Sequence, residues 1–134
     1  MRLKQAKWIK ENYRFRKLYR RGKFHNLKEV SVYFRERQDD QVFVAVAISR
    51  KVRGAVQRNA TKRRLRAYIQ NFDGRFQPGR EIIFMARPGL MEAEFHELYS
   101  RLEKALYRAD LIEPKDSLED SKPEDGALEA AEEV

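Results

Sequence analysis

The chain has 134 residues, which is enough for one domain with a modest hydrophobic core but too few for a second full domain. It carries 29 Lys and Arg against 21 Asp and Glu, and the resulting formal charge of +8 favours a polyanion as partner. The chain lacks cysteine and has two distant histidines, so we expect neither disulfides nor a protein-held metal ion. It shows neither a run of about 18 apolar residues nor a signal segment, so we expect a cytoplasmic protein without a membrane anchor.

The N-terminal region combines a basic start with a short amphipathic segment. The first ten residues carry four cations and few bulky apolar side chains, so we expect a loosely held arm. A first helix is predicted over about 12–21, because Asn12 suits an N-cap and Gly22 suits the position after the last turn. Its apolar side chains at helical spacing are Phe15, Leu18 and Tyr19. A short strand around 23–27 stays an open alternative.

Two strands with different patterns follow. Val30, Val32 and Phe34 alternate with polar and tyrosine residues, which predicts a half-buried strand. The nearly continuous apolar run over 42–48 suits a central strand that is covered on both faces. Turn-forming residues at 38–41 lie between them, so we expect the two strands to pair as an antiparallel hairpin.

The remaining elements are a helix, a strand and a last helix. Gly54 interrupts the apolar pattern, and a helix is predicted over about 55–72. A short strand over 81–86 stops before Pro88, which has no amide hydrogen for a ladder, and a last helix is predicted over about 91–110. The order helix, strand, strand, helix, strand, helix indicates an α+β domain, in which helices pack on a small mixed sheet.

Charge divides the chain into two parts. Residues 113–134 contain nine acids and two lysines, a net charge of −7, which leaves 27 basic and 12 acidic residues, or +15, in residues 1–112. The last segment also has too few large apolar side chains to offset the entropy cost of ordering it. We therefore predict a basic domain over 1–112, which repels itself unless a polyanion is near, and a disordered acidic tail over 113–134.

The stretch that says most about function is 49–66, which contains no acid. On the predicted helix, several of its polar side chains share one face. They are Asn59, Lys62, Arg63 and Arg66, with Arg58 at the edge. A solvated charged face normally mixes signs, so an acid-free face favours phosphate, to which arginine can donate two parallel hydrogen bonds.

Three segments carry a family resemblance. The main one is Ser49-Arg50-Lys51-Val52 followed by Ala55-Val56-x-Arg58-Asn59-x-x-Lys62-Arg63-x-x-Arg66. The others are Phe15-x-x-Leu18-Tyr19-x-x-Gly22 and Ile82-Ile83-Phe84-Met85-Ala86-Arg87-Pro88. Together they resemble the signature segment, first helix and last strand of the bacterial ribonuclease P protein family. Two positions depart from the family pattern, since Arg53 precedes Gly54 where the family has glycine directly, and Ala60 takes the place of an arginine.

The resemblance implies the role of an accessory subunit. In the family, the RNA subunit hydrolyses the phosphodiester with Mg²⁺ and the protein binds both that RNA and the 5′ leader of precursor tRNA, so neither a catalytic residue nor a protein-bound cofactor is expected. The implied RNA-binding residues are Arg50, Lys51, Arg58, Asn59, Lys62, Arg63 and Arg66. The implied leader-binding cleft between the first helix and the sheet contains Phe15, Tyr19 and Tyr33. The family also has an unusual left-handed strand-helix-strand crossover.

The residues themselves agree that catalytic side chains are missing. The basic part contains no glycine-rich phosphate loop, no paired histidine and nucleophile and no carboxylate cluster suited to two-metal hydrolysis. We interpret the acids of the last predicted helix and both histidines as solvating residues. They are Glu92, Glu94, Glu97, Glu103, His25 and His96.

Two other functions compete with this interpretation. A ribosomal or other structural RNA-binding protein would share the basic α+β composition, and only the family-like segments argue against it. A DNA-binding regulator could use the helix over 55–72 for recognition, but no partner helix stands at helix-turn-helix spacing, so we expect no DNA partner.

Overall fold

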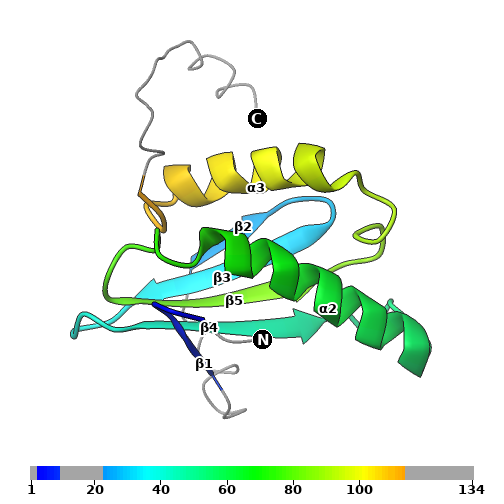
Figure 1. The fold of residues 1–134 in the computed structure, drawn as a ribbon, viewed down its shortest axis with the longest axis horizontal. Coiled ribbons are helices and arrows are strands. Elements are labelled where there is room, and N and C mark those ends of the chain that lie inside the picture. Colours follow the sequence, from blue (N-terminus) through cyan, green and yellow to red (C-terminus); the bar gives the residue numbers. More distant parts are fainter. Residues whose placement is uncertain (1–2, 10–22, 114–134) are drawn as a thin grey trace.

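The computed structural model describes residues 3–9 and 23–113, which form one five-stranded sheet with two helices packed on it (Figure 1). In chain order the elements are β1 (Lys7–Trp8), β2 (Lys23–Asn26), β3 (Val30–Glu36), β4 (Val42–Ile48), α2 (Ala55–Phe72), β5 (Arg80–Ala86) and α3 (Phe95–Arg108). The sheet order is β1-β4-β5-β3-β2, with both parallel and antiparallel pairs. This arrangement confirms the mixed α+β class, while the helix predicted over 12–21 and the tail lie outside the described residues.

Most element boundaries agree with the sequence. β4 and α2 have the predicted bounds, and the short strand suspected near residue 25 is present as β2. The last helix begins four residues later than predicted, at Phe95. The reason is a cap, because the Glu94 carboxylate accepts a hydrogen bond from the Glu97 amide at 2.9 Å while the preceding residues form turns.

The pairing predicted for β3 and β4 is wrong. β5 lies between them, antiparallel to β3 with Val30 opposite Ala86, and parallel to β4 with Val42 opposite Arg80. β5 takes the centre because it is apolar on both faces, and its Ile82, Ile83 and Phe84 are fully buried there. The turn at 38–41 therefore reverses the chain across the width of one strand and does not close a hairpin.

The β4–α2–β5 connection links two parallel neighbours. In Figure 1 these strands run from left to right, β5 lies above β4, and α2 crosses in front of them. Seen along the strand direction, the second strand, β5, thus lies to the left of the first, β4, and the connecting helix lies in front of the sheet. This geometry is a left-handed crossover, whereas such connections are generally right-handed. The crossover therefore has the handedness that the family resemblance implies.

The main core lies between the sheet and the two helices. α2 contributes Leu65, Tyr68, Ile69 and Phe72, which is the apolar stripe that the sequence predicts beside the basic face. α3 contributes Leu98, Leu102 and Leu106. Two near-parallel ring pairs join the helices, since Tyr68 stacks on Phe95 at 4.1 Å and Phe72 on Tyr99 at 4.6 Å between centroids. The basic helix is therefore held rigidly against the sheet.

The N-terminal segment is not the loose arm that we predicted from its charge. The Asp73 carboxylate, just after α2, accepts hydrogen bonds from the backbone amides of Gln5 and Ala6 at 3.1 and 3.0 Å. β1 then pairs in parallel with the edge of β4, and Ile9 is buried. The Asp73 carboxylate and the edge of β4 thus order a segment whose sequence suggests a loose arm.

An ion pair between buried Glu29 and partly exposed Arg101 ties α3 to the start of β3, and it predicts a pH dependence. Glu29 accepts two hydrogen bonds from the Arg101 guanidinium, at 3.1 and 3.0 Å, which lower the pKa of this carboxyl from its usual 4.5. A lowered folded-state pKa stabilises the fold above pH 4.5, and this contribution disappears as the pH falls through the lower value. We expect Glu29→Gln to reduce the free energy of unfolding by about 1 kcal/mol at pH 7, because Arg101 stays partly in solvent.

Urea unfolding between pH 3 and 7 measures this effect. The difference between the Glu29→Gln variant and the parent should shrink below pH 4.5, where the parent carboxyl becomes protonated as well. The matched control is Glu92→Gln, because Glu92 is exposed and makes no ion pair with a described residue. A difference that stays constant with pH would contradict the proposed contribution of the Glu29 charge.

Candidate nucleic-acid interface

A tight turn between β4 and α2 presents the first cations of the basic stretch. The Val52 amide donates to the Ser49 carbonyl at 3.0 Å, and the Lys51 amide donates to the Ser49 hydroxyl at 3.2 Å. Gly54 then leads into α2 with φ of +88°, a backbone conformation that disfavours other residues. Arg50, Lys51 and Arg53 are exposed around this turn, at the end of the sheet.

Arg58 holds this turn from the first turn of α2. Its Nη1 donates to the carbonyl oxygens of Ser49 and Val52 at 3.1 and 2.9 Å. The guanidinium is half-buried, and both acceptors are neutral, so its positive charge still contributes to the local potential. Arg58 therefore orders the loop that carries Lys51 and Arg53, whatever contact it makes with a ligand.

Replacing Arg58 with lysine tests this role. A lysine keeps the charge but has no planar fork to reach two carbonyls together, so we expect the turn to loosen. The melting temperature should fall by about 4 °C, which corresponds to roughly 1 kcal/mol in a domain of this size. Calorimetry measures this shift, and Arg63→Lys on the exposed side of the same helix should leave it unchanged. Equal melting temperatures for both variants would contradict the role assigned to Arg58.

The outer face of α2 is basic and lacks compensating acids. Asn59, Lys62 and Arg63 are exposed, and no carboxylate of the described residues forms an ion pair with them. Arg66 is half-buried, with its guanidinium 5.4 Å from the centre of the Trp8 ring. The structure thus brings together the predicted residues of the turn and of the first half of α2, while Arg66 also packs on the N-terminal segment.

Arg64 points away from this basic face, as its place on the helix predicts. Its guanidinium donates to the Ala93 carbonyl at 3.2 Å and lies 5.6 Å from the centre of the Phe95 ring. It therefore joins α2 to the segment before α3. The basic face that remains open consists of the turn cations with Asn59, Lys62 and Arg63.

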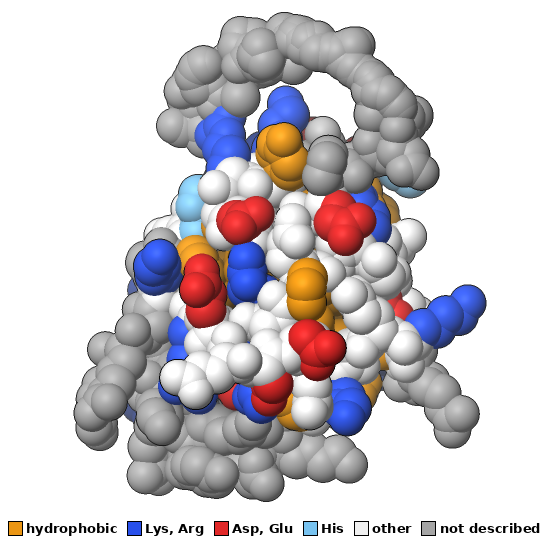
Figure 2. All heavy atoms as spheres, turned by 90° about the vertical axis from the view of Figure 1, so that its left-hand side faces the viewer, with side chains coloured by type: hydrophobic (Ala, Val, Ile, Leu, Met, Phe, Trp, Pro, Cys, Tyr) orange, Lys and Arg blue, Asp and Glu red, His pale blue; other side chains and the backbone are white. Residues whose placement is uncertain are grey.

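The opposite end of the molecule has a different charge pattern. Figure 2 shows that end, at the left of Figure 1, where acidic and basic side chains are interspersed. The ion pairs near the starts of β4 and β5 include Arg80–Asp110 at 3.1 Å and Arg37–Asp39 at 2.6 Å. Hydrogen bonds from Arg37 lower the pKa of Asp39 to about 2, so this acid keeps its charge. This end therefore differs from the N-terminal end of α2, where exposed cations have no carboxylate partner among the described residues.

The second predicted site lies on the sheet face away from the helices. Tyr33 is half-buried there and packs beside a small apolar cluster formed by Ile9, Ala45 and Ile83. Phe15 and Tyr19, the other predicted leader-binding residues, lie outside the described residues. The structure therefore places one of the three aromatic residues of this site.

A buried carboxylate on the same face was not predicted. Glu81 is fully buried, and its Oε1 accepts from Arg35 Nε at 2.8 Å while its other oxygen pairs with Arg37. Arg37 also lies 4.4 Å from the centre of the Phe43 ring. Arg35, Glu81 and Phe43 stand opposite one another on three adjacent strands. Two arginines are thereby held two and four positions beyond Tyr33, a feature that depends on the register and is invisible in the sequence.

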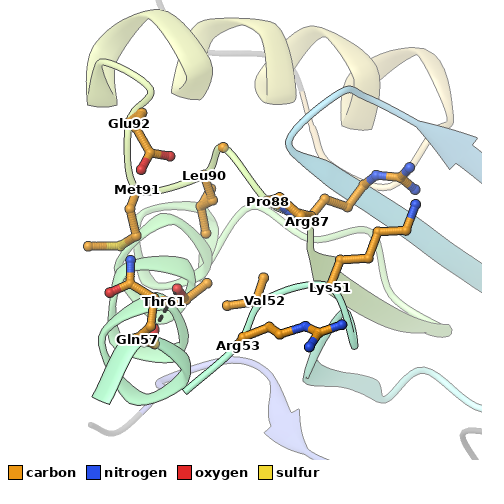
Figure 3. A pocket seen from close by; sticks show the side chains of 11 residues that line it. Lys51, Val52, Arg53, Gln57, Thr61, Arg87, Pro88, Leu90, Met91 and Glu92 are labelled. Carbon is orange, nitrogen blue, oxygen red and sulfur yellow. Dashed lines mark hydrogen bonds between the residues drawn. The ribbon is translucent and has the colours of Figure 1, made fainter. Parts of the chain in front are cut away.

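A pocket of about 220 Å³ opens between the turn and the loop after β5 (Figure 3). The turn contributes Lys51, Val52 and Arg53, and α2 contributes Gln57 and Thr61. The loop contributes Arg87, Pro88, Gly89, Leu90, Met91 and Glu92. The sequence analysis named only Lys51 of these residues as a site residue, because the pocket joins segments that lie more than twenty residues apart.

The acids that we interpreted as solvating include structural ones. Glu94 caps α3, and Glu103 pairs with Arg75 at 2.9 Å. Glu97 binds Arg101 one helical turn away, at 3.1 Å. Within residues 3–9 and 23–113, no three acidic or histidine side chains gather into a possible metal site. No helix in the same residues is long and apolar enough to cross a bilayer.

An acid-free basic helix packed on the face of a mixed sheet is typical of a small nucleic-acid-binding protein. The family model for ribonuclease P matches residues 3–110 of this chain. The chain therefore belongs to the ribonuclease P protein family, and its function is that of the accessory protein subunit of this endoribonuclease, whose partner is an RNA.

Individual relatives agree with the family model. The ribonuclease P protein component of Clostridioides difficile is 30% identical over 112 residues, which cover 83% of this chain and 98% of the relative. That of Thermoanaerobacter sp. (strain X514) is 33% identical over 111 residues, with coverages of 83% and 95%. A structure of the Staphylococcus aureus RNase P protein has the same fold, with a TM-score of 0.68 at 24% identity, and covers 81% of this chain and 100% of that one.

Proposed function

We propose that this protein binds the catalytic RNA of ribonuclease P and the 5′ leader of precursor tRNA, and so promotes removal of the leader. The observation that carries the proposal is the run of exposed cations over the turn and the first half of α2, none of which pairs with a described carboxylate. Such cations can bind phosphate at little cost in free energy, because no existing ion pair has to be broken. Binding of this kind releases counterions and depends strongly on salt.

The basic face is the proposed contact with the catalytic RNA. Exposed Arg50, Lys51, Asn59, Lys62 and Arg63 face solvent without a carboxylate partner among the described residues. In this proposal they neutralise phosphates where two RNA chains approach each other, and Arg58 and Arg66 add charge from half-buried positions. Mg²⁺ acts with the RNA subunit, which supplies the chemistry, and the protein contributes binding and no catalytic side chain.

The sheet face with Tyr33 is the proposed contact with the leader. An aromatic ring can stack on an unpaired base with little sequence demand, which suits a subunit that accepts many leaders. Glu81 holds Arg35 and Arg37 two and four positions beyond that ring in the chain. Phe15 and Tyr19 complete this site in the proposal, and the whole reaction takes place in the cytoplasm.

Reconstitution tests this function directly. The purified full-length protein is added to a ribonuclease P RNA at a low Mg²⁺ concentration, where the RNA alone cleaves slowly, and leader removal from precursor tRNA is followed. We expect the protein to restore cleavage and to bind the leader-bearing tRNA more tightly than the mature tRNA. A structural RNA-binding protein of the ribosomal kind would restore nothing, and a DNA-binding protein would prefer duplex DNA in competition.

A further inference from the structure

The pocket between the β4–α2 turn and the loop after β5 occupies a position where α/β proteins bind ligands. β4 and β5 are parallel, and both end beside this pocket, at Ile48 and Ala86. α2 begins at its rim, with no acidic side chain in its first turn and no side-chain cap at Gly54. The carboxyl ends of parallel strands and the start of the following helix together favour a negatively charged group.

Three cations of the rim carry uncompensated charge. Lys51 and Arg53 are exposed, and within the described part of the chain the Arg87 side chain donates to neutral acceptors only, Ser31 Oγ at 3.1 Å and Asn26 Oδ1 at 3.4 Å. No described carboxylate forms an ion pair with any of the three. In Figure 3, Lys51 and Arg87 lie on the side of the pocket away from Glu92. An anion is therefore favoured at the cationic side.

The other lining residues suit a flat, partly apolar group. Val52 and Leu90 are buried, and Met91 is half-buried with an unbranched side chain that adapts to a bound ring. The Thr61 hydroxyl donates to the main-chain carbonyl of Gln57 at 2.8 Å, so it is already occupied. The side-chain amide of Gln57 is exposed and can bond to a ligand. A volume of 220 Å³ is below the roughly 300–1,000 Å³ of drug-sized pockets. This small volume suits a single base.

We propose that this pocket binds a single unpaired nucleotide of the protein's RNA partner. Its phosphate lies between Lys51, Arg53 and Arg87, its base packs on Met91, and the Gln57 amide bonds the edge of the base. The site extends the basic face of α2 around the turn and gives it a contact that a duplex cannot make. The inference rests on the proposed function, because the RNA subunit and the leader are the two sources of such a nucleotide.

Matched pairs of variants of the full-length chain test the site. Met91→Glu places a negative charge in the pocket, and Gln70→Glu places the same charge on an exposed position near the other end of α2. Gln57→Ala and Gln70→Ala remove one exposed amide each. Binding is measured at 0.1 M salt with ribonuclease P RNA, precursor tRNA and mature tRNA, and melting temperatures establish that each variant is folded.

We expect Met91→Glu to weaken binding of at least one RNA by about tenfold, the loss typical of one base contact, and Gln57→Ala by about threefold. A loss confined to precursor tRNA identifies the leader as the source of the nucleotide, and a loss with ribonuclease P RNA identifies the RNA subunit. The proposal is overturned if both pocket variants match their Gln70 controls with all three RNAs. Failure of the proposed function is a separate result, since the unmodified protein would then restore no cleavage.

Discussion

Replacing Lys62 and Arg63 together with glutamine is expected to weaken RNA binding by about 100-fold at low salt, with each lost charged contact costing roughly tenfold. Both side chains are exposed on the basic face of α2, and neither has a carboxylate partner among the described residues. Their loss therefore removes phosphate contacts without leaving a buried charge unpaired. The fold should be unaffected or slightly stabilised, because two like charges one residue apart no longer repel each other.

The salt dependence of binding distinguishes direct phosphate contacts of the α2 face from a general effect of the protein's net charge. Each lost phosphate contact should reduce the slope of log affinity against log salt by about 0.7 to 0.9, so the double variant should lose about 1.4 to 1.8 in total. The matched control replaces Lys104 and Arg108, two exposed cations of α3, with glutamine. Equal losses of affinity and slope in the two double variants would show that net charge, and not the α2 face, drives binding.

Phe72→Ala should have the largest effect on stability, a loss of about 3–5 kcal/mol in the free energy of unfolding. Phe72 is the last residue of α2, is fully buried, and stacks on Tyr99 of α3 with 4.6 Å between ring centroids. Its removal leaves a cavity between the two helices and the sheet. Since domains of this size are stable by about 5–15 kcal/mol, the variant should be close to unfolding at 37 °C.

Urea unfolding measures this loss, and the same helix provides its control. Val56 is 82% exposed, so Val56→Ala should change the free energy of unfolding by less than about 0.5 kcal/mol. RNA binding adds a second comparison, because folded Phe72→Ala protein should still bind through the basic face at low temperature. A loss below about 1 kcal/mol for Phe72→Ala would mean that the two helices are packed less firmly than the ring stacking indicates.

The local elements and the basic face could be predicted from the sequence. The helical spacing of its apolar residues and the preceding Gly54 predict α2, and the absence of acids over 49–72 predicts that its exposed side is basic. Both features depend on residues that are close together in the sequence. The periodicity of one segment is therefore enough to predict them.

The features that the sequence did not reveal all depend on distant pairings. An apolar run such as β5 fits the centre of a sheet beside several partners, and only the assembled sheet decides that it separates β3 from β4. Asp73 binds amides 67 and 68 residues away, and Glu81 acquires its arginines through the register between β3 and β5. The pocket likewise exists only once the turn and the loop after β5 meet.

The capture of the N-terminal segment by Asp73 and β4 sets an order of events during synthesis. Ala6 leaves the ribosome 67 residues before the carboxylate that binds its amide, a delay of roughly 3–13 s at the usual rate of translation. During that time the segment lacks its Asp73 acceptor, and a protease or a nascent-chain modifying enzyme can reach it. This segment is thus fixed only after α2 and the residue that follows it have been made, and trimming it early would expose the edge of β4 that it normally covers.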